Sequence, residues 1–209
     1  MYQPAHFKEE RLEVQHALIK AHPFGLLVSV RPNGPEANGV PFLLDSETAP
    51  LGVLKTHVAR ANNQWRNLDG QNVLAVFQGP RAYVSPSNYE TKRETGKVVP
   101  TWNYVMVQVR GMARVHEDAH WLKAQVTSLT QTHEAGLAQP WQVSDAPSTY
   151  IESQLKGIVG IEIAIVSIEG KWKVSQNRPE ADRRGVADGF GEGAAVMADL
   201  VRQYGGLED

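Results

Sequence analysis

The sequence predicts a mainly β protein with helices (α+β), built as an antiparallel barrel-like sheet with peripheral helices. About six apolar segments of strand length occur along the chain, and most are joined by short turns. Helical segments interrupt them, but the regular strand and helix alternation of a parallel sheet is missing. The 209 residues suit one main core, so we expect a single domain over 1–209 with a C-terminal helical extension from about 179 to 209.

The predicted strands are apolar runs bounded by turn residues. The first two form a hairpin, because the RPNGPEA segment between them supplies turn residues. Gly79-Pro80 marks a turn or a bulge, since proline cannot donate a hydrogen bond to a central strand pair. The predicted strands are residues 24–30, 38–44, 51–57, the two runs 72–78 and 81–85 that flank Gly79-Pro80, 99–116 and 159–170.

The predicted helices carry apolar residues spaced three or four apart. Glu117-Asp118 opens one of them, where acidic residues suit the positive end of the helix dipole. The charged segment 90–97 lacks this periodicity and is expected to be an exposed, mobile loop. The predicted helices are residues 8–21, a helix carrying Val58, Ala61, Trp65 and Leu68, one carrying Leu122, Val126 and Leu129, a short one capped by Ser148, and a final one carrying Met197, Leu200, Val201 and Tyr204.

Composition narrows the class of protein. Lysine and arginine number 21 against 23 acidic residues, a formal net charge of -2, which argues against a chain whose main role is to coat nucleic acid. The absence of cysteine excludes disulfides, thiolate metal sites and cysteine nucleophiles. No segment resembles a signal peptide and no run is long enough to span a bilayer, so we expect a soluble cytoplasmic protein without a membrane partner.

The segment LKTHVARAN (54–62) is the first candidate binding segment. A strand is expected to give way to a helix near His57, and Thr56, Arg60 and Asn62 lie around that junction. Unpaired backbone amides, the helix dipole and an arginine in the first turn together suit a phosphate. The alternative is that Thr56 only caps the helix and Arg60 is solvated.

The segment VPTWNY (99–104) is the second candidate. Trp102 and Asn103 offer an aromatic face and an amide group at the start of a strand, which suit a flat heteroaromatic ring with polar edges. The alternative is that these residues only pack, because aromatic residues are good strand formers.

The segment KWKVSQNR (171–178) follows a long apolar strand. In an extended chain Lys171, Lys173, Ser175 and Asn177 share one face, whereas the other face carries Trp172, Val174 and Gln176. One face is typical of packing, and the other is suited to an anion.

Common catalytic motifs are missing from the sequence. There is no phosphate-loop GK[ST], no HExxH and no GxSxG, and GFGEG (189–193) has no preceding strand. His116 and His120 are spaced four apart at an acidic helix entry, which favours a solvated pair over a metal site. Catalytic residues therefore stay unknown, no metal site is expected, and whether the chain is an enzyme is left open.

Several uncommon motifs occur in a fixed order over nearly the whole chain: MYQPAHF, HVARAN, FQGPRAYVSPSNY, VPTWNY and GKWKVSQNR. In this the sequence resembles the PaiB-type family of bacterial FMN-binding proteins, which is similar to the split-barrel flavoproteins that include pyridoxamine phosphate oxidase and the flavin reductases. The resemblance implies an antiparallel split β-barrel of the FMN-binding type, with FMN as cofactor. It also implies a homodimer with one FMN per subunit at the dimer interface.

The resemblance also assigns residues to the cofactor. It makes the four residues of LKTHVARAN that are listed below candidates for the FMN phosphate and ribityl chain. It places Trp102 and Asn103 near the flavin. Lys173 and Gln176, in the C-terminal strand motif, would approach the cofactor from either subunit. The implied cofactor-binding residues are Thr56, His57, Arg60, Asn62, Trp102, Asn103, Lys173 and Gln176.

Three functions follow as hypotheses. Family members are commonly described as negative transcriptional regulators of protease production and sporulation, so the first is an FMN-binding repressor, with DNA as a partner on the family description alone. The second is an FMN-dependent oxidoreductase or flavin reductase, because the cofactor itself carries the electron transfer. The third is a dimeric ligand-binding or haem-handling barrel with His57 or His116 as axial ligand.

Overall fold

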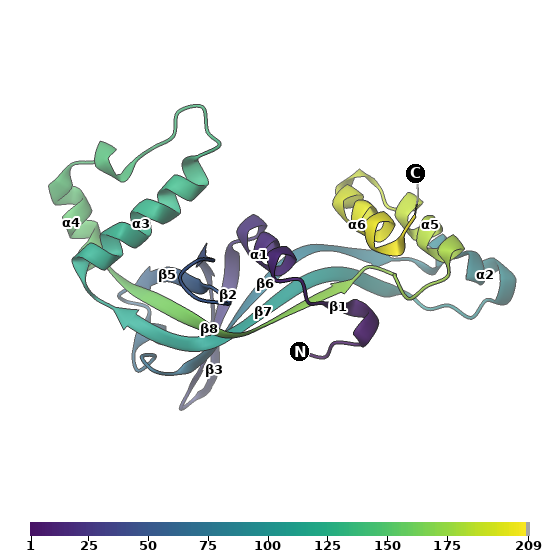
Figure 1. Ribbon diagram of the computed structural model, residues 1–209, viewed down its shortest axis with the longest axis horizontal. Coiled ribbons are helices and arrows are strands. Elements are labelled where there is room, and N and C mark those ends of the chain that lie inside the picture. Colours follow the sequence, from purple (N-terminus) through teal and green to yellow (C-terminus); the bar gives the residue numbers. More distant parts are fainter. Residues whose placement is uncertain (208–209) are drawn as a thin grey trace. The chain divides into compact units, whose positions relative to one another are not determined.

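The structure, a computed structural model, describes residues 1–207 and confirms the predicted antiparallel sheet with peripheral helices (Figure 1). The chain divides into two compact units. The first holds residues 1–18, 78–107 and 169–207, and the second holds 19–77 and 108–168. In the described residues no helix combines the length and apolarity needed to cross a membrane.

The sheet has eight strands in the order β3-β2-β6-β7-β8-β5-β4, with β1 paired to β8. Three long strands, β6, β7 and β8, contribute residues to both units. The strands are β1 (Lys8–Glu9), β2 (Phe24–Arg31), β3 (Gly34–Pro41), β4 (Leu43–Asp45), β5 (Val53–Ala59), β6 (Asn72–Val84), β7 (Thr101–His116) and β8 (Ile158–Lys173).

The β2–β3 hairpin of the second unit is tighter than predicted. Arg31 pairs with Gly34, so only two residues form the loop instead of the whole RPNGPEA segment. Gly34 has φ +112, a conformation that L side chains rarely adopt, which is why a glycine suits this position. The tight turn sets the register of all eight pairs in the hairpin.

The predicted helix carrying Val58, Ala61, Trp65 and Leu68 is wrong. Strand β5 continues to Ala59, which pairs with Ile158 of β8, and only a 3-10 turn over Asn63–Trp65 follows. Pairing with β8 satisfies the backbone of residues 53–59 and overrides the helical spacing of the apolar side chains. Asparagine-rich turns, including Asn67 at φ 61, then carry the chain to β6.

Gly79-Pro80 lies inside a single strand, β6, and does not separate two strands. Burial alternates along β6 until Pro80 and Arg81, two successive residues of which neither is buried, and then resumes in the opposite phase. This change of phase is the mark of a bulge, one of the two predicted alternatives.

The helices of the second unit are α3 (Ala119–Glu134) and α4 (Ser148–Lys156), close to their predicted positions. The Asp118 carboxylate caps α3 by accepting from the Trp121 amide at 2.8 Å. α3 packs closely on β8, because a Cβ at Gly160 would lie 2.2 Å from the Trp121 ring. The predicted cap at Ser148 is wrong: Pro147 is the N-cap of α4, and no side chain caps that end.

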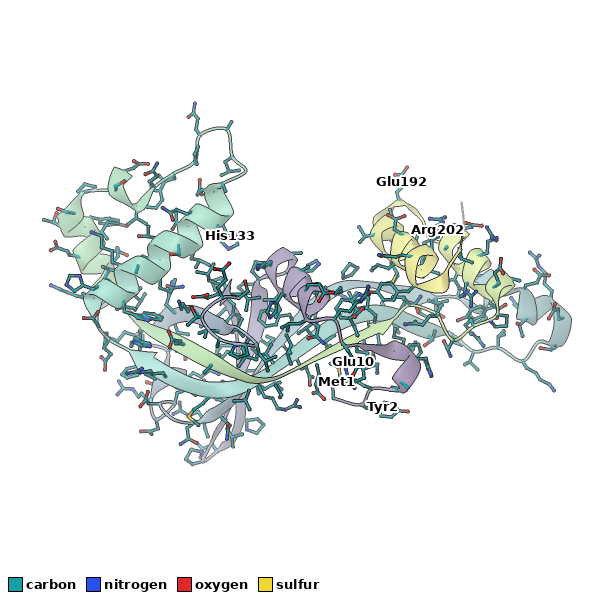
Figure 2. All side chains as sticks on the ribbon, in the orientation of Figure 1. Met1, Tyr2, Glu10, His133, Glu192 and Arg202 are labelled. Atoms are coloured by element: carbon teal, nitrogen blue, oxygen red, sulfur yellow. The ribbon has the colours of Figure 1, made fainter. Side chains whose placement is uncertain are left out.

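The first unit carries α2 (Glu90–Thr95), α5 (Glu180–Asp188) and α6 (Ala195–Gly205), and α1 (Leu12–Ala21) begins in it. The sequence predicts α6 as the final helix, and α5 lies in the predicted C-terminal helical extension without being predicted as a separate helix. On α6, Arg202, labelled in Figure 2, pairs with Asp188 at 3.0 Å. Tyr204 donates to the buried Glu9 carboxylate at 2.7 Å, and the hydrogen bond from Arg11 lowers the pKa of Glu9 to about 2.

The segment predicted as a loop, 90–97, contains α2, and Asp182 of α5 anchors it. The Asp182 carboxylate is fully buried and accepts from both the backbone amide and the hydroxyl of Thr91, each at 2.9 Å. Since a carboxylate holds the first turn of α2, the positive end of this short helix is neutralised. Asp182 of α5 therefore anchors the first turn of α2 within this charged segment.

We predict that Asp182→Ala lowers the free energy of unfolding by roughly 1 to 3 kcal/mol and speeds tryptic cleavage after Lys92 and Arg93, because the donors of Thr91 lose their acceptor. The matched control is Asp188→Ala, which removes an exposed acid from the same helix. Urea unfolding and a digestion time course measure both effects. Equal cleavage of the two variants would contradict the anchoring role of Asp182.

Candidate functional site

A cavity of about 210 Å³ lies in the first unit and collects the polar groups that the C-terminal strand motif predicts. We call it the Lys173 pocket. Lys173, Ser175 and Asn177 line it, as expected for one face of KWKVSQNR, and Asn103 of VPTWNY joins them. The full lining is Tyr89, Val99, Thr101, Asn103, Lys173, Ser175, Asn177 and Arg178.

The polar face forms for a different reason from the one predicted. Strand β8 ends at Lys173, and the chain turns at Ser175, which has φ 67. This left-handed conformation is unusual for a residue other than glycine. The buried Asn103 side chain holds it, since its amide nitrogen donates to the Ser175 hydroxyl at 2.9 Å and its amide oxygen lies 3.2 Å from the same hydroxyl.

The Lys173 pocket is positively charged. Its two ionisable cations are Lys173 and Arg178, and no aspartate or glutamate belongs to the described lining. The Lys173 ammonium is partly buried and donates to the Thr101 hydroxyl at 2.7 Å and to the Trp102 carbonyl. Burial first, and then the charges of Lys171 and Arg178, lower the pKa of Lys173. An anion in the pocket would oppose this lowering, because a nearby negative charge favours the charged ammonium.

Arg178 is held at the wall of this pocket. Its guanidinium stacks over the Tyr89 ring at 4.2 Å, and its Nε lies 4.0 Å from the Asp182 carboxylate. At this distance Asp182 attracts Arg178 as an ion-pair partner but accepts no hydrogen bond from it, because its oxygens accept from Thr91 instead. Arg178 is a site residue that the predicted set omits, although it is the last residue of the motif KWKVSQNR.

Lys171 does not join the predicted lysine face. It is buried, donates to the Tyr2 carbonyl at 3.0 Å and lies over the rings of Tyr2 and Tyr104 at 5.3 and 5.4 Å. Tyr2 is labelled on the N-terminal segment in Figure 2. Because β1 pairs with β8 at Lys171, this segment covers the lysine and removes it from the pocket.

Trp102 and Gln176, the remaining predicted residues of the first unit, differ in whether their side chains are open to a ligand. The Trp102 indole is exposed and meets Tyr83 edge-on, with ring centroids 5.8 Å apart. The Gln176 side chain turns back on its own loop, accepting from the Val174 amide at 2.8 Å and donating to the Trp172 carbonyl. Trp102 therefore offers an open aromatic surface, whereas Gln176 shapes the turn after β8.

In the second unit, Thr56 and His57 lie on β5 and are bonded to protein groups. The Thr56 hydroxyl is buried and donates to the Pro41 carbonyl at 2.6 Å. The Nδ1 atom of His57 lies 2.8 Å from the amide oxygen of Gln125 on α3. Both side chains thus stabilise the packing of β5 against its neighbours.

Arg60 and Asn62 follow β5, without the α-helix that the phosphate argument assumed. Arg60 forms an ion pair with Glu117 and donates to the carbonyls of Lys156 and Ile158 at 2.9 and 3.2 Å. The Asn62 carboxamide caps the 3-10 turn by accepting from the Gln64 amide at 2.9 Å. The structure thus brings Arg60 together with an acidic residue rather than with an anion-binding helix end.

His116, named as a haem ligand in the third hypothesis, is stacked flat on Trp121 with ring centroids 4.2 Å apart. Burial lowers the pKa of His116, which keeps its imidazole neutral. Its Nε2 is buried without a hydrogen-bond partner among residues 1–207, and Glu162 lies 4.0 Å away. Within the same described range no cluster of three or more histidine, aspartate or glutamate residues could hold a metal ion.

Comparison with known proteins decides the family. Residues 1–167 match the model of the family described as "Putative FMN-binding domain". A relative from Bacillus subtilis, named Protease synthase and sporulation protein PAI 2, is 32% identical over 96% of this chain and 96% of its own length. The chain belongs to the PaiB-type family of FMN-binding proteins. FMN is accordingly its cofactor.

Other matches extend this picture. An uncharacterized protein of Emericella nidulans is 35% identical over 100% of this chain and 99% of its own length. Among solved structures, a flavocytochrome from Azotobacter vinelandii aligns with a TM-score of 0.59 and 14% identity, covering 79% of this chain and 69% of its own. The FAD and heme binding protein from Mycobacterium smegmatis aligns with a TM-score of 0.57 and 15% identity, over 78% and 71%. These structures support the predicted split-barrel fold.

The groups in the Lys173 pocket fit one part of FMN. Two cations, three hydroxyls and two side-chain amides without an acidic residue form a donor set suited to a phosphate. The volume of about 210 Å³ lies below the roughly 300 to 1,000 Å³ typical of pockets that enclose a whole small ligand. The pocket therefore fits the phosphate end of the cofactor better than the entire molecule.

We predict that Ser175→Ala lowers the free energy of unfolding by roughly 1 to 3 kcal/mol, because Asn103 loses its buried partner while the left-handed backbone stays. Ser175→Gly loses the same bond but relaxes the backbone, so it should be more stable than the alanine variant by about 1 kcal/mol. Urea unfolding of both variants measures the difference. A glycine variant no more stable than the alanine variant would contradict strain at Ser175.

Proposed function

We propose that the protein acts as an FMN-binding homodimer of the PaiB type, with a regulatory role, and that the Lys173 pocket holds the FMN phosphate. The observation that carries the proposal is the convergence of Lys173 and Arg178 on one pocket without a lining carboxylate. Two cations at close range repel each other, and a doubly charged phosphate is the natural counter-charge.

Asn103, Ser175 and Asn177 supply neutral hydrogen-bonding groups to the same phosphate-binding pocket. The exposed Trp102 ring is suited to contact the flat ring system of the cofactor, because its backbone carbonyl accepts from Lys173 and so ties it to the pocket. When bound, FMN supplies one- or two-electron redox chemistry, and the protein supplies placement and charge.

Thr56, His57, Arg60, Asn62 and Gln176 complete the proposed cofactor-binding set. If the segment after β5 binds FMN, Arg60 must leave the Glu117 carboxylate and bind the phosphate or ribityl oxygens of the cofactor instead. The guanidinium group of Arg60 then keeps an oxygen acceptor in both states. The contribution of this segment is open to test separately from the Lys173 pocket, because each arginine or lysine can be replaced alone.

A homodimer is supported by an exposed apolar face in the second unit, which we call the β2–β3 face. Residues directly opposite in paired strands share a face of the sheet. The pairs Leu26 with Gly39 and Leu26 with Val76 therefore join three strands on one side. The face comprises Phe24, Leu26, Val28, Val30, Pro35, Ala37, Gly39, Pro41, Leu74 and Val76.

Several members of this face are strongly exposed, with Phe24 at 69% and Val30 at 81%. Phe24 lies across Gly39, where a Cβ would come within 2.9 Å of its ring, so the aromatic ring shields the glycine backbone. A contiguous apolar surface of this kind is typical of a protein interface. We propose that a second copy of the chain covers it.

An FMN-dependent oxidoreductase is the second candidate function. The near-balanced charge of the chain favours it over direct DNA binding, because sequence-independent phosphate contacts require a basic surface. Bleaching of the flavin absorbance by a nicotinamide cofactor supports the oxidoreductase. A sequence-selective shift of promoter DNA that resists moderate salt supports the regulator.

We predict that the purified protein shows a flavin spectrum, or quenches the fluorescence of added FMN, and that Lys173→Gln weakens FMN binding at least tenfold, since a charge-assisted contact is worth roughly 1.5 to 3 kcal/mol. The control is Lys97→Gln, an exposed lysine of the same unit. Arg60→Ala, measured in parallel, tests the segment after β5. Unchanged affinity in the Lys173 variant would remove the pocket from the FMN site.

We predict that Val30→Glu shifts the protein from a dimer toward the 23.1 kDa monomer, because a carboxylate buried in an apolar interface is costly. Light scattering coupled to size-exclusion chromatography measures the mass. Val196→Glu on α6, also an exposed apolar residue, should leave the dimer intact. A monomeric wild-type protein, or a dimer in both variants, would exclude this face as the interface.

A further inference from the structure

A second cavity, of about 430 Å³, lies in the second unit between α3, α4 and the segment that joins them. Its volume falls within the roughly 300 to 1,000 Å³ range of pockets that hold small ligands. None of the residues assigned above to FMN lines it. The lining residues are Lys123, Thr127, Gln131, Gln142, Val143, Ser144, Ala146, Ser148, Ile151, Glu152 and Leu155.

The cavity has an apolar part. Val143 and Leu155 are buried beneath it, and Ile151 and Ala146 are partly exposed to it. Ile151 and Leu155 belong to α4, Val143 belongs to the 3-10 turn Val143–Asp145, and Ala146 directly follows that turn, so most of the apolar part is built on regular structure. A ligand with a small aliphatic group would gain about 25 cal/mol for each Å² of apolar surface that it buries here.

Two opposite charges also line the cavity without neutralising each other. Lys123 projects from α3 and Glu152 from α4. Neither side chain forms an ion pair with any residue of the described part of the chain, 1–207. The nearby Arg60 and Glu117 do form an ion pair in the same unit, which shows that charges of this region pair where geometry allows.

The uncapped start of α4 adds a third polar feature at the cavity. Pro147 and Ser148 provide no side-chain cap, and the first backbone hydrogen bonds of the helix belong to Tyr150 and Ile151. The amides of Ser148 and Thr149 therefore remain available, and Ser148 lines the cavity. Such a helix end favours a carboxylate. The ammonium group of Lys123 favours a carboxylate as well, so both features suit the same ligand group.

We propose that this cavity binds a small zwitterion, a free α-amino acid with an aliphatic side chain. Its ammonium group pairs with Glu152, its carboxylate with Lys123 and the start of α4, and its side chain packs on Val143 and Leu155. Both side chains are exposed, and a zwitterion offers a counter-charge to each of them, whereas a ligand of one charge would pair with only one. The hydroxyl and amide groups of Thr127, Gln131 and Ser144 complete the polar wall.

The test begins with thermal shift and calorimetry of the full chain against each standard amino acid. At least one aliphatic amino acid, with L-leucine as the first probe, should bind. Its N-acetyl derivative, which lacks the ammonium group, and its amide, which lacks the carboxylate, should each bind at least tenfold more weakly, in line with the loss of one charge-assisted contact.

Variants locate the binding within the chain. Lys123→Gln and Glu152→Gln should each weaken binding of the amino acid about tenfold and leave FMN binding unchanged. Lys20→Gln and Glu47→Gln, at exposed positions of the same unit, serve as matched controls. Absence of binding by any amino acid, equal binding of the amide and the free acid, or full affinity in both cavity variants would overturn the proposal.

Discussion

The hydrogen bond between Asn103 and Ser175 is the interaction on which the first unit depends. Ser175 turns the chain out of β8 through a left-handed conformation, and the buried Asn103 side chain holds that turn against β7. A strained residue persists only where its surroundings determine it strongly. Because the turn occurs at this point, Lys173 before it and Arg178 after it face one pocket, and α5 starts where Asp182 can reach α2.

Much of the sheet follows from local sequence alone. Apolar runs and their turn residues predict every long strand, because strand formation here needs only buried alternate faces and breaks between them. The strand motif KWKVSQNR also predicts a polar face suited to an anion, and three of its four members line one pocket. Lys171 is the exception, because pairing of β1 with β8 is a long-range contact that no local pattern reveals.

Two other local predictions fail because long-range contacts decide the structure there. The helical spacing from Val58 to Leu68 is genuine, yet pairing of β5 with β8 decides the backbone. The segment 90–97 has the composition of a loop, yet part of it is helical, and the distant Asp182 anchors the first turn of that helix. Of the proposed cofactor residues, Asn103 and Lys173 are brought together in one pocket, whereas the acceptors around Arg60 come from residues 117 to 158.

The composition of β3 restricts how a second copy can associate. This strand lies at one edge of the sheet order, where unpaired backbone groups would allow another strand to extend the sheet. Pro35 and Pro41 sit near its two ends and lack the amide hydrogen that such pairing requires. Association by strand addition is therefore disfavoured, while the apolar β2–β3 face remains open. Natural edges are commonly protected in this way, so the exposed apolar residues on the face itself are better explained by contact between faces than by pairing of edges.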